Sequence, residues 1–271
     1  MQSQLDPTAA DGYKSNSQIA RRVTEFWFSE WMYCPSCPSK EVEQTRGSTK
    51  VVDFECSRCG AEYQLKSKQG VLGRKLRDAA YAPMMDRVSA GLAPHFAFMT
   101  YRKQPWEIVD LLLVPRHFLT PAAIVAAAPL SATARRAGWV GCSIKLDEIP
   151  LDGRVFVIQG GSVLDPRRVR ELWSKFAWLE NLEVESRGWT TDVWNCIQRL
   201  GKQSFILADV YSFEAQLAAK HPKNRHVRDK IRQQLQVLRD QNLLRFDSRG
   251  NYSVSKSSRA SSKPSSLSNP K

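Results

Sequence analysis

The sequence predicts a mixed α/β domain with an embedded zinc site, followed by a smaller, mainly helical domain of the winged-helix class. Three observations support this fold class. Two Cys-x-x-Cys pairs lie in the N-terminal third, alternating apolar and polar residues typical of strands flank the second pair, and helical spacing followed by a hairpin pattern fills the C-terminal third. The chain has 271 residues, of which 42% are hydrophobic, so it can bury a core in one or two domains.

Four of the six cysteines form two closely spaced pairs. They read Cys34-Pro-Ser-Cys37 and Cys56-Ser-Arg-Cys59, with eighteen residues between the pairs. This spacing is typical of zinc sites, because two residues between thiolates allow a tight turn to direct both sulfurs at one ion. We therefore expect a closed structural site of four thiolates. Two disulfides or a chance arrangement are the alternatives, and a reducing compartment disfavours the first.

Residues 50–55 and 62–66 alternate as two strands would, one on each side of the second cysteine pair. On the second strand Glu62, Gln64 and Lys66 share a face. Asp53, separated from Gln64 by ten residues, completes a pattern similar to the D…(D/E)xK signature of metal-dependent nucleases. Two strands of mixed acids and lysines are also common on a solvated sheet face, so the pattern alone leaves both interpretations open.

The next element with a clear start is a helix predicted from Asp165 through Trp178. Asp165 is the expected N-cap and Pro166 the first helical residue, and the helix is expected to pack on the sheet. A domain boundary is expected at residues 182–188, where Ser186-Arg-Gly188 interrupts the helical pattern.

Three helices and a hairpin are predicted beyond this boundary. Residues 190–200, 207–221 and 227–241 carry apolar side chains at helical spacing, and residues 244–254 alternate around a Ser-Arg-Gly turn. In a winged helix the third helix enters the major groove of DNA. The candidate DNA contacts lie at its N-terminal end and at the hairpin tip, and they are Asn224, Arg225, His226, Arg228, Arg232 and Arg249. A single basic residue more often holds a phosphate than reads a base.

Basic residues are concentrated in this C-terminal part. The formal net charge is +13, with 24 basic and 21 acidic residues up to residue 186, and 16 basic and 6 acidic residues after it. Such an excess favours a polyanionic partner, either nucleic acid or an anionic membrane surface. Residues 256–271 are rich in Ser, Lys and Pro, and we expect them to form a disordered basic tail. We expect no membrane span and no secretory signal, and hence a cytoplasmic location.

The chain resembles the DpnI family of restriction endonucleases over about residues 13–254. Beyond the cysteine pairs, the motifs that carry the resemblance are Tyr13-Lys-Ser-Asn-Ser-Gln18, Leu65-Lys-Ser-Lys68, the Tyr-Ala-x-Met-Met-x-Arg-Val pattern of residues 81–88, Thr133-Ala-Arg-Arg-Ala-Gly-Trp139 with Gly141-Cys142, Ser186-Arg-Gly-Trp-Thr190, Asn195-Cys-Ile197, and Lys230-Ile-Arg-Gln-Gln-Leu-Gln236 with Leu238-Arg-Asp240. The resemblance implies a bacterial type IIM enzyme that cuts double-stranded DNA at GATC sites carrying N6-methyladenine.

The resemblance also implies an architecture and a set of cofactors. A PD-(D/E)XK catalytic domain with a structural Zn²⁺ would span residues 1–183, a winged helix residues 184–255, and the tail residues 256–271. Catalysis would use Mg²⁺. The partner would be methylated duplex DNA, and the protein would act as a monomer with no protein partner.

Residue roles follow from the same resemblance. Asp53 would be the metal-binding acid, Gln64 and Leu65 the further magnesium ligands, and Lys66 the catalytic lysine. Arg135 and Arg136 would anchor phosphates beside Trp139, whose ring would contact the methyl group. The alternative for Trp139 is an ordinary core position.

The sequence departs from the family pattern at position 64. The family has an acid there, whereas Gln64 offers an amide oxygen without charge, so Mg²⁺ should bind less tightly. Val52 stands where the generic signature has proline, and Glu62 could partly replace the missing acid. Two alternatives to an active nuclease therefore remain, a reader of methylated DNA that is impaired in catalysis and a zinc-ribbon winged-helix regulator of transcription.

Overall fold

The computed structural model of the protein describes residues 1–45 and 52–255, so the expected tail at residues 256–271 lies outside the described residues. The chain divides into two compact units, and the division falls after Thr191. Among the described helices, none combines the length and the apolar character needed to cross a membrane.

The first unit is built around a seven-stranded sheet. Its strand order is β1-β2-β3-β5-β6-β9-β10, with β3 and β5 parallel and the other neighbours antiparallel. The strands are β1 (Glu43–Gln44), β2 (Phe54–Glu55), β3 (Glu62–Gln69), β5 (His95–Lys103), β6 (Trp106–Val114), β9 (Val155–Gln159) and β10 (Ser162–Val163). The strands β3, β5 and β6 form its centre, and the longest runs of buried residues lie in β5 and β6.

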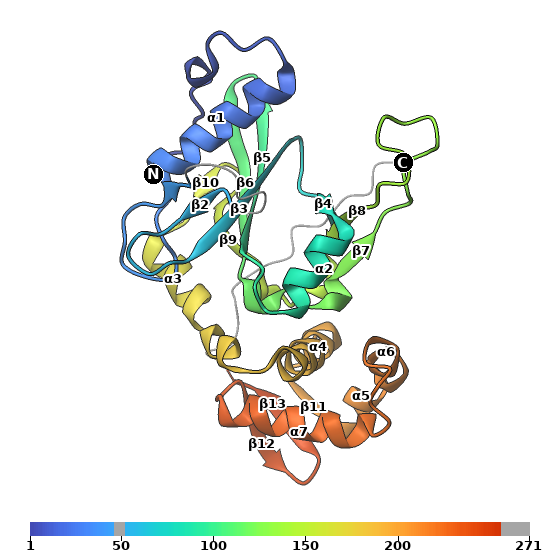
Figure 1. Cartoon of the computed structure of the whole chain (residues 1–271). Helices are drawn as coiled ribbons and strands as arrows, with labels where there is room; N and C mark the ends of the chain where they lie inside the picture. The colour runs from blue at the N-terminus through green and yellow to red at the C-terminus, as the bar shows by residue number, and fades with distance from the viewer. Residues whose placement is uncertain (46–51, 256–271) are drawn as a thin grey trace. The chain divides into compact units, whose positions relative to one another are not determined.

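Two helices, α1 (Asn16–Trp31) and α3 (Pro166–Ser174), cover one face of this sheet, as Figure 1 shows. Val23 and Trp27 lie four positions apart on α1 and therefore face the same way. They pack in one apolar cluster with strand residues and with Trp173 of α3. Each helix therefore buries one apolar side against the sheet, as expected for amphipathic helices.

The alternation of β3 places its functional side chains on the other face. Tyr63 belongs to the apolar cluster and Leu65 packs against it. Because successive strand residues point to opposite faces, Gln64 and Lys66 lie on the face that α1 and α3 do not cover.

A second, three-stranded sheet completes the first unit. Its order is β4-β8-β7, with β4 at Lys75–Ala80, β8 at Gly141–Lys145 and β7 at Ile124–Ala126. Helix α2 (Tyr81–Ser89) follows β4 directly and lies beside this sheet in Figure 1. Short 3-10 helices connect the strands, and they are η1 (Pro7–Ala10), η2 (Arg116–Phe118), η3 (Pro121–Ala123), η4 (Leu146–Glu148), η5 (Leu151–Gly153) and η6 (Ala177–Asn181).

The second unit contains short helices and a small sheet. Its elements are α4 (Val184–Leu200), which begins before the division, β11 (Ser204–Ile206), α5 (Leu207–Tyr211), α6 (Glu214–Lys220), α7 (Val227–Asp240), β12 (Leu244–Ser248) and β13 (Asn251–Val254), with the sheet order β11-β13-β12. A helical bundle with a two-stranded wing was expected. The structure adds β11, which pairs with β13.

The predicted elements are present, with shifted ends. The first predicted strand is reduced to β2, because Val52 and Asp53 precede the pairing and residues 50–51 lie outside the described residues. Asp165 caps α3 as expected, its side chain accepting the N–H of Arg167 at 2.8 Å, but α3 ends at Ser174 and not at Trp178.

In the second unit, α4 starts before residue 190, so Ser186-Arg-Gly188 is helical and does not form a linker. The second predicted helix is broken between α5 and α6. The hairpin is confirmed: Ser248 pairs with Asn251, which leaves Arg249 and Gly250 as a two-residue turn, and Gly250 has a φ of 74°.

Gly153 offers a test of the packing of the first unit. A Cβ at this position would lie 2.7 Å from Cγ of Phe118 and 2.8 Å from Cγ2 of Ile149. We expect Gly153→Ala to lower the free energy of unfolding by about 1–3 kcal/mol, because the added methyl group overpacks the core. Gly73→Ala is the matched control, since its nearest neighbour is the Lys75 carbonyl at 3.6 Å. Denaturant melts that give both variants the same stability would contradict this packing.

Candidate functional site

The four cysteine sulfurs of the two pairs meet at one point. The Sγ atoms of Cys34 and Cys59 are 3.6 Å apart, as are those of Cys37 and Cys56, and all four lie within 4.8 Å of one another. Four sulfurs bound tetrahedrally at about 2.3 Å from one ion are about 3.8 Å apart, so the spacing fits zinc. It does not fit a disulfide, in which the sulfurs are bonded at about 2.05 Å.

The second cysteine pair forms the turn between β2 and β3. Within this turn the N–H of Cys56 donates to the carbonyl of Ala61 at 2.9 Å, and the N–H of Gly60 donates to the carbonyl of Cys56 at 2.8 Å. Burial opposes ionisation of Cys56, but hydrogen bonds from the N–H groups of Cys59 and Arg58 and from neighbouring thiols lower its pKa to about 7. The turn that joins the two strands is therefore also half of the metal-binding group.

Two side chains outside the cysteine pairs hold this group in place. The Tyr63 hydroxyl lies 3.2 Å from Sγ of Cys34, within hydrogen-bond distance. Nε of Arg170, on α3, donates to the carbonyls of Cys34 and Cys37 at 3.2 Å. Its guanidinium also lies 4.6 Å from the centre of the Tyr33 ring. These contacts orient the first cysteine pair from the neighbouring helix.

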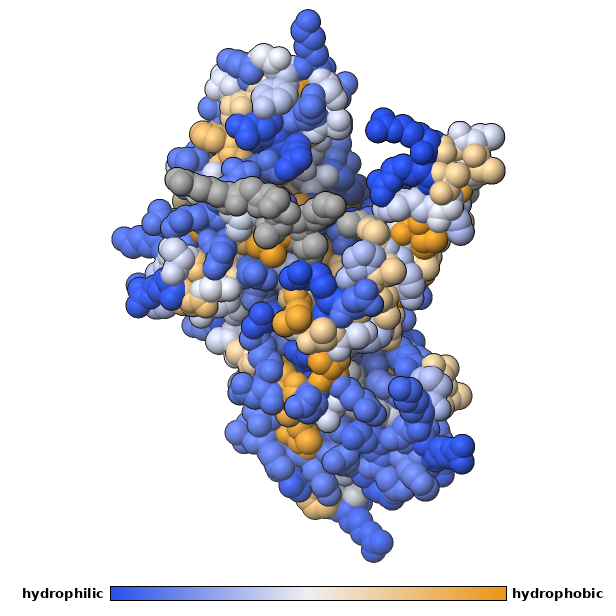
Figure 2. Space-filling model, viewed as in Figure 1, coloured by the Kyte–Doolittle hydropathy of each residue, from blue (hydrophilic) through white to orange (hydrophobic). Residues whose placement is uncertain are grey.

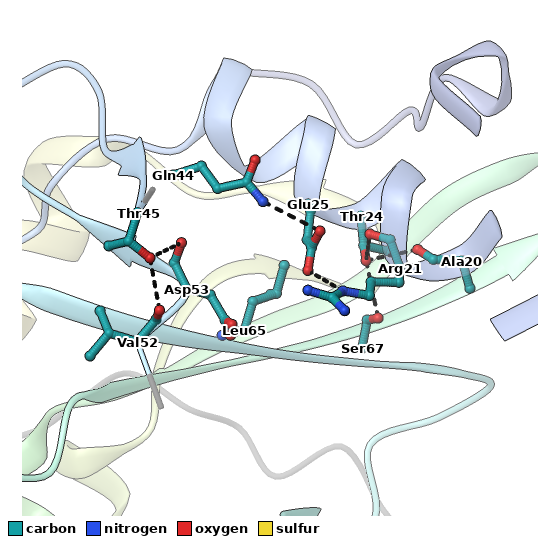
Figure 3. Close-up of polar contacts among 10 residues, drawn as sticks. All are labelled: Ala20, Arg21, Thr24, Glu25, Gln44, Thr45, Val52, Asp53, Leu65 and Ser67. Atoms are coloured by element: carbon teal, nitrogen blue, oxygen red, sulfur yellow. Dashed lines mark hydrogen bonds and ion pairs between the residues drawn. The ribbon is translucent and has the colours of Figure 1, made fainter. Parts of the chain in front are cut away.

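Asp53 is held against β3 on both sides of Gln64. Its N–H donates to the carbonyl of Tyr63 at 2.9 Å, and its Oδ2 accepts the N–H of Leu65 at 2.9 Å. Figure 3 shows the Asp53 carboxylate close to Leu65. Asp53, Gln64, Leu65 and Lys66, four residues expected to act together, are thus neighbours in the structure.

The environment of Asp53 favours a cation nearby. Burial raises the pKa of its carboxyl; the Leu65 N–H and the charge of Lys66 act in the opposite direction, and the charge of Glu25 raises it further. Glu25 itself is paired with Arg21, whose Nε lies 2.6 Å from its Oε1 (Figure 3). A carboxyl whose ionised form is disfavoured by burial gains from a bound cation.

Gln64 offers a second oxygen to such a cation. Its side chain is 4% exposed, and its Oε1 has no hydrogen-bond partner among the described residues. A buried amide oxygen without a partner is costly unless something binds it. From the sequence, Glu62 could replace in part the acid that the family has at position 64. Its Oε2 instead lies 3.7 Å from a guanidinium nitrogen of Arg87. The chemistry of Asp53 and Gln64, two oxygen donors side by side, fits a hard cation such as Mg²⁺.

Lys66 completes the group and has a partner that the sequence did not suggest. Its Nζ lies 2.7 Å from Oδ1 of Asp78 on β4. Spacing in the sequence cannot reveal this pair, because it joins two different sheets. Asp78 is an ordinary acid within the pattern Lys75-Leu-Arg-Asp78, and Arg170 near the cysteines gave no signal either.

The loop between β7 and β8 carries the proposed methyl-reading residues. It is closed by hydrogen bonds from the N–H of Leu130 to the carbonyl of Trp139, and from the N–H of Gly138 to the carbonyl of Leu130, both 3.0 Å. Trp139 is half-buried and outside the core, and the Arg136 guanidinium lies 4.6 Å from the centre of its ring. Arg135 is exposed. The loop projects from the body in Figure 1, and Figure 2 shows both hydrophilic and weakly apolar residues at its end.

In the second unit, α7 buries Val227, Ile231, Leu235 and Leu238, the stripe predicted for the third helix. Its candidate DNA contacts differ in what they touch. Nε of Arg228 lies 2.8 Å from Oε2 of Glu214.

Two further candidates, Arg232 and Asn224, also have partners within the protein. The Arg232 guanidinium donates to the Tyr211 hydroxyl at 3.0 Å, and the side chain of Asn224 caps the N–H of His226 at 2.8 Å. Arg225, His226 and Arg249 are exposed. Lys220, one of the basic residues counted in the C-terminal part, has its Nζ 2.7 Å from Oδ1 of the buried Asp192, so its charge is balanced within the fold.

Comparison with known protein families agrees with this two-unit arrangement. The family model described as DpnI, the Dam-replacing family, matches residues 1–182, and the model of the Dam-replacing HTH domain matches residues 185–254. The first match includes both cysteine pairs and the Asp53 group, and the second covers α4 through β13. The chain therefore belongs to the Dam-replacing family represented by DpnI and combines its α/β domain with its helix-turn-helix domain.

Proposed function

We propose that the protein is a methylation-dependent type II restriction endonuclease. It hydrolyses phosphodiester bonds in both strands of duplex DNA at GATC sites that contain N6-methyladenine. The observation that carries the proposal is the group at β3, in which Asp53 is fixed beside the unpaired oxygen of Gln64 and Lys66 follows on the same face. Membership of the DpnI family supports it.

Asp53 and Gln64, through their side-chain oxygens, and Leu65, through its backbone carbonyl, would hold the catalytic Mg²⁺. When bound, this ion neutralises charge on the scissile phosphate and lowers the pKa of a coordinated water. The Lys66 ammonium would donate hydrogen bonds to the phosphate or the attacking water and stabilise the negative charge that develops there. Asp53 precedes β2 and Gln64 lies on β3, and the cysteine turn joins these two strands, so the two residues would be positioned before DNA binds.

The four cysteines would hold a structural Zn²⁺. All four ligand positions are filled by protein, which leaves none for a substrate. The ion would keep the turn between β2 and β3 closed, and with it the two sides of the cleavage site.

Two surfaces would bind the DNA. In the first unit Arg135 and Arg136 would anchor phosphates beside Trp139, whose half-buried ring is available to an apolar methyl group in the major groove. In the second unit the exposed Arg225, His226 and Arg249, with Asn224, Arg228 and Arg232, would contact the duplex from α7 and the wing. The protein would bind as a monomer.

Cleavage of one plasmid in two forms tests the proposed function. We expect the adenine-methylated form to be cut at GATC with Mg²⁺, and we expect no cutting of the unmethylated form or of either form in EDTA. Cutting of both forms would contradict dependence on the methyl group. If no form is cut but methyl-dependent binding is retained in a gel shift, the protein is a reader that has lost activity through Gln64.

Two substitutions test the roles within the Asp53 group. Lys66→Ala should lower the cleavage rate by about 10²- to 10⁴-fold and leave DNA binding in EDTA unchanged. Gln64→Glu should maintain or raise cleavage and lower the Mg²⁺ concentration for half-maximal rate by about tenfold, because it adds a charged ligand. A large loss of cleavage in Gln64→Glu would mean that the amide itself is required.

Removal of one thiol tests the zinc site. Cys59→Ser should abolish stoichiometric zinc, measured by elemental analysis, and lower the melting temperature by about 10 °C or more, because structural zinc contributes directly to folding. Cys196→Ala is the control, because this buried cysteine lies outside the group of four. Full zinc content in Cys59→Ser would contradict the assignment of the four ligands.

A further inference from the structure

We propose that Asp78 is a positioning residue for Lys66, whose buried carboxylate fixes the catalytic ammonium relative to Asp53 and Gln64. The inference rests on the proposed nuclease function and adds to the site a residue from the second sheet. Asp78 would act only through Lys66.

The pair is a short ion pair with a buried carboxylate. Oδ1 of Asp78 lies 2.7 Å from Nζ of Lys66, and its side chain is 3% exposed. The lysine side chain is 29% exposed, so it is not closed off from solvent. A lysine ammonium sits at the end of a flexible four-carbon stem and samples many rotamers unless a partner holds it.

The backbone of β4 is shaped to deliver this carboxylate. β4 pairs with β8 through Arg77 with Ser143 and Ala80 with Gly141, and the register shifts between these two pairs. Asp78 lies within this irregularity. Bulges of this kind redirect a side chain, and they are common beside active sites. Leu76 is buried and Arg77 is exposed, so the alternation along β4 also directs Asp78 to the buried side.

The other carboxylate oxygen of Asp78 lies near a neutral thiol, so Lys66 is the cation that balances the charge of Asp78 here. Oδ2 of Asp78 lies 4.0 Å from Sγ of Cys142, the first residue after the Gly141 pair. Burial, and then the charge of Asp78, raise the pKa of the Cys142 thiol to about 11, so the thiol is neutral. On the other side, Lys66 also acts on Asp53, whose pKa its charge lowers against the effect of burial. The ammonium therefore interacts with two acids, Asp78 on β4 and Asp53 just before β2.

A matched ion pair in the same unit separates positioning from stability. Nζ of Lys175 lies 2.6 Å from Oδ1 of Asp152, and the Asp152 side chain is 2% exposed. This lysine–aspartate pair is close to the Lys66–Asp78 pair in distance and in the burial of its carboxylate, and neither residue belongs to the Asp53 group. Asp152→Asn and Asp78→Asn should therefore destabilise the fold to a similar extent, because each removes one partner of a buried pair.

The experiment compares Asp78→Asn, Asp78→Glu and Asp152→Asn with the wild type. The substrate is a short duplex with one methylated GATC site. We expect Asp78→Asn to lower the single-turnover cleavage rate by about 10- to 100-fold, the usual cost of a misplaced catalytic group. Its affinity for the duplex in EDTA should stay within about twofold of wild type, and Asp78→Glu should recover part of the rate. Asp152→Asn should cleave at the wild-type rate despite a lower melting temperature.

Three results would overturn the inference. They are a wild-type rate in Asp78→Asn, an equal loss of rate in Asp152→Asn, or a loss in Asp78→Asn that appears only as weaker DNA binding. If Asp78→Asn does not fold, Asp78→Ser serves as the second charge-removing variant, with the same expectations. A wild-type protein that leaves the methylated duplex intact contradicts the proposed function, and this inference with it, whereas wild-type cleavage with an unaffected Asp78→Asn contradicts the inference alone.

Discussion

The candidate site depends on the meeting of four cysteine sulfurs at the turn between β2 and β3. β2 contains two residues, too few to fix a strand pair by backbone hydrogen bonds alone. The turn that follows it is closed by Cys56 and Cys59 and tied to Cys34 and Cys37 on a separate segment. Asp53 lies just before this short strand, so its distance from Gln64 is set by how firmly the turn is held.

The same turn couples the site to the rest of the first unit. Tyr63 contacts the sulfur of Cys34 on one side and is followed by Gln64 on the other, so one residue of β3 faces the cysteines and the next faces the site. Arg170 reaches the cysteine segment from α3, which packs on the sheet through Trp173. The helix α3, the cysteine group and the strand β3 are thus joined by contacts within a few residues.

Sequence patterns predicted the parts of the structure that depend on local spacing. The cysteine group, the strand at residues 62–66, the N-cap at Asp165 and the hairpin tip at Arg249 each follow from a fixed distance along the chain, and the structure contains all four. The elements whose ends were misplaced are those in which packing outweighs local signals. Gly188 lies inside α4 although it is unfavourable in a helix, because the residues around it are buried.

Contacts between sheets could not be predicted in this way. The partner of Lys66 comes from β4, and β4 is placed by its pairing with β8, more than sixty residues further along the chain. The engagement of Arg228 by Glu214, and of Lys220 by Asp192, likewise depends on how helices pack and not on the charge count. The net charge favoured a polyanionic partner. It did not show which basic side chains are already paired with acids inside the fold.

The second sheet brings the two proposed activities, methyl reading and cleavage, into one element. Trp139 lies two residues before β8, and the N–H of Tyr81, the first residue after β4, donates to the carbonyl of Val140 at 3.0 Å. Asp78 lies three residues before Tyr81 on the paired strand. The loop that would contact the methyl group and the carboxylate that holds Lys66 are therefore separated by one strand pairing.

Because Gln64 is neutral, the site has one negative charge fewer than a site with an acid at this position. Of the acids around it, Glu25 is paired with Arg21 and Asp78 with Lys66, which leaves Asp53 as the carboxylate that a metal ion would use. Magnesium is usually held by one or two carboxylates together with substrate phosphates. A site with one such carboxylate and a neutral amide gives the ion less charge from the protein, so a larger share must come from the DNA backbone. Metal binding and DNA binding would then reinforce each other more strongly than in a site with two acids, and the protein would load its catalytic ion chiefly when the substrate is already in place.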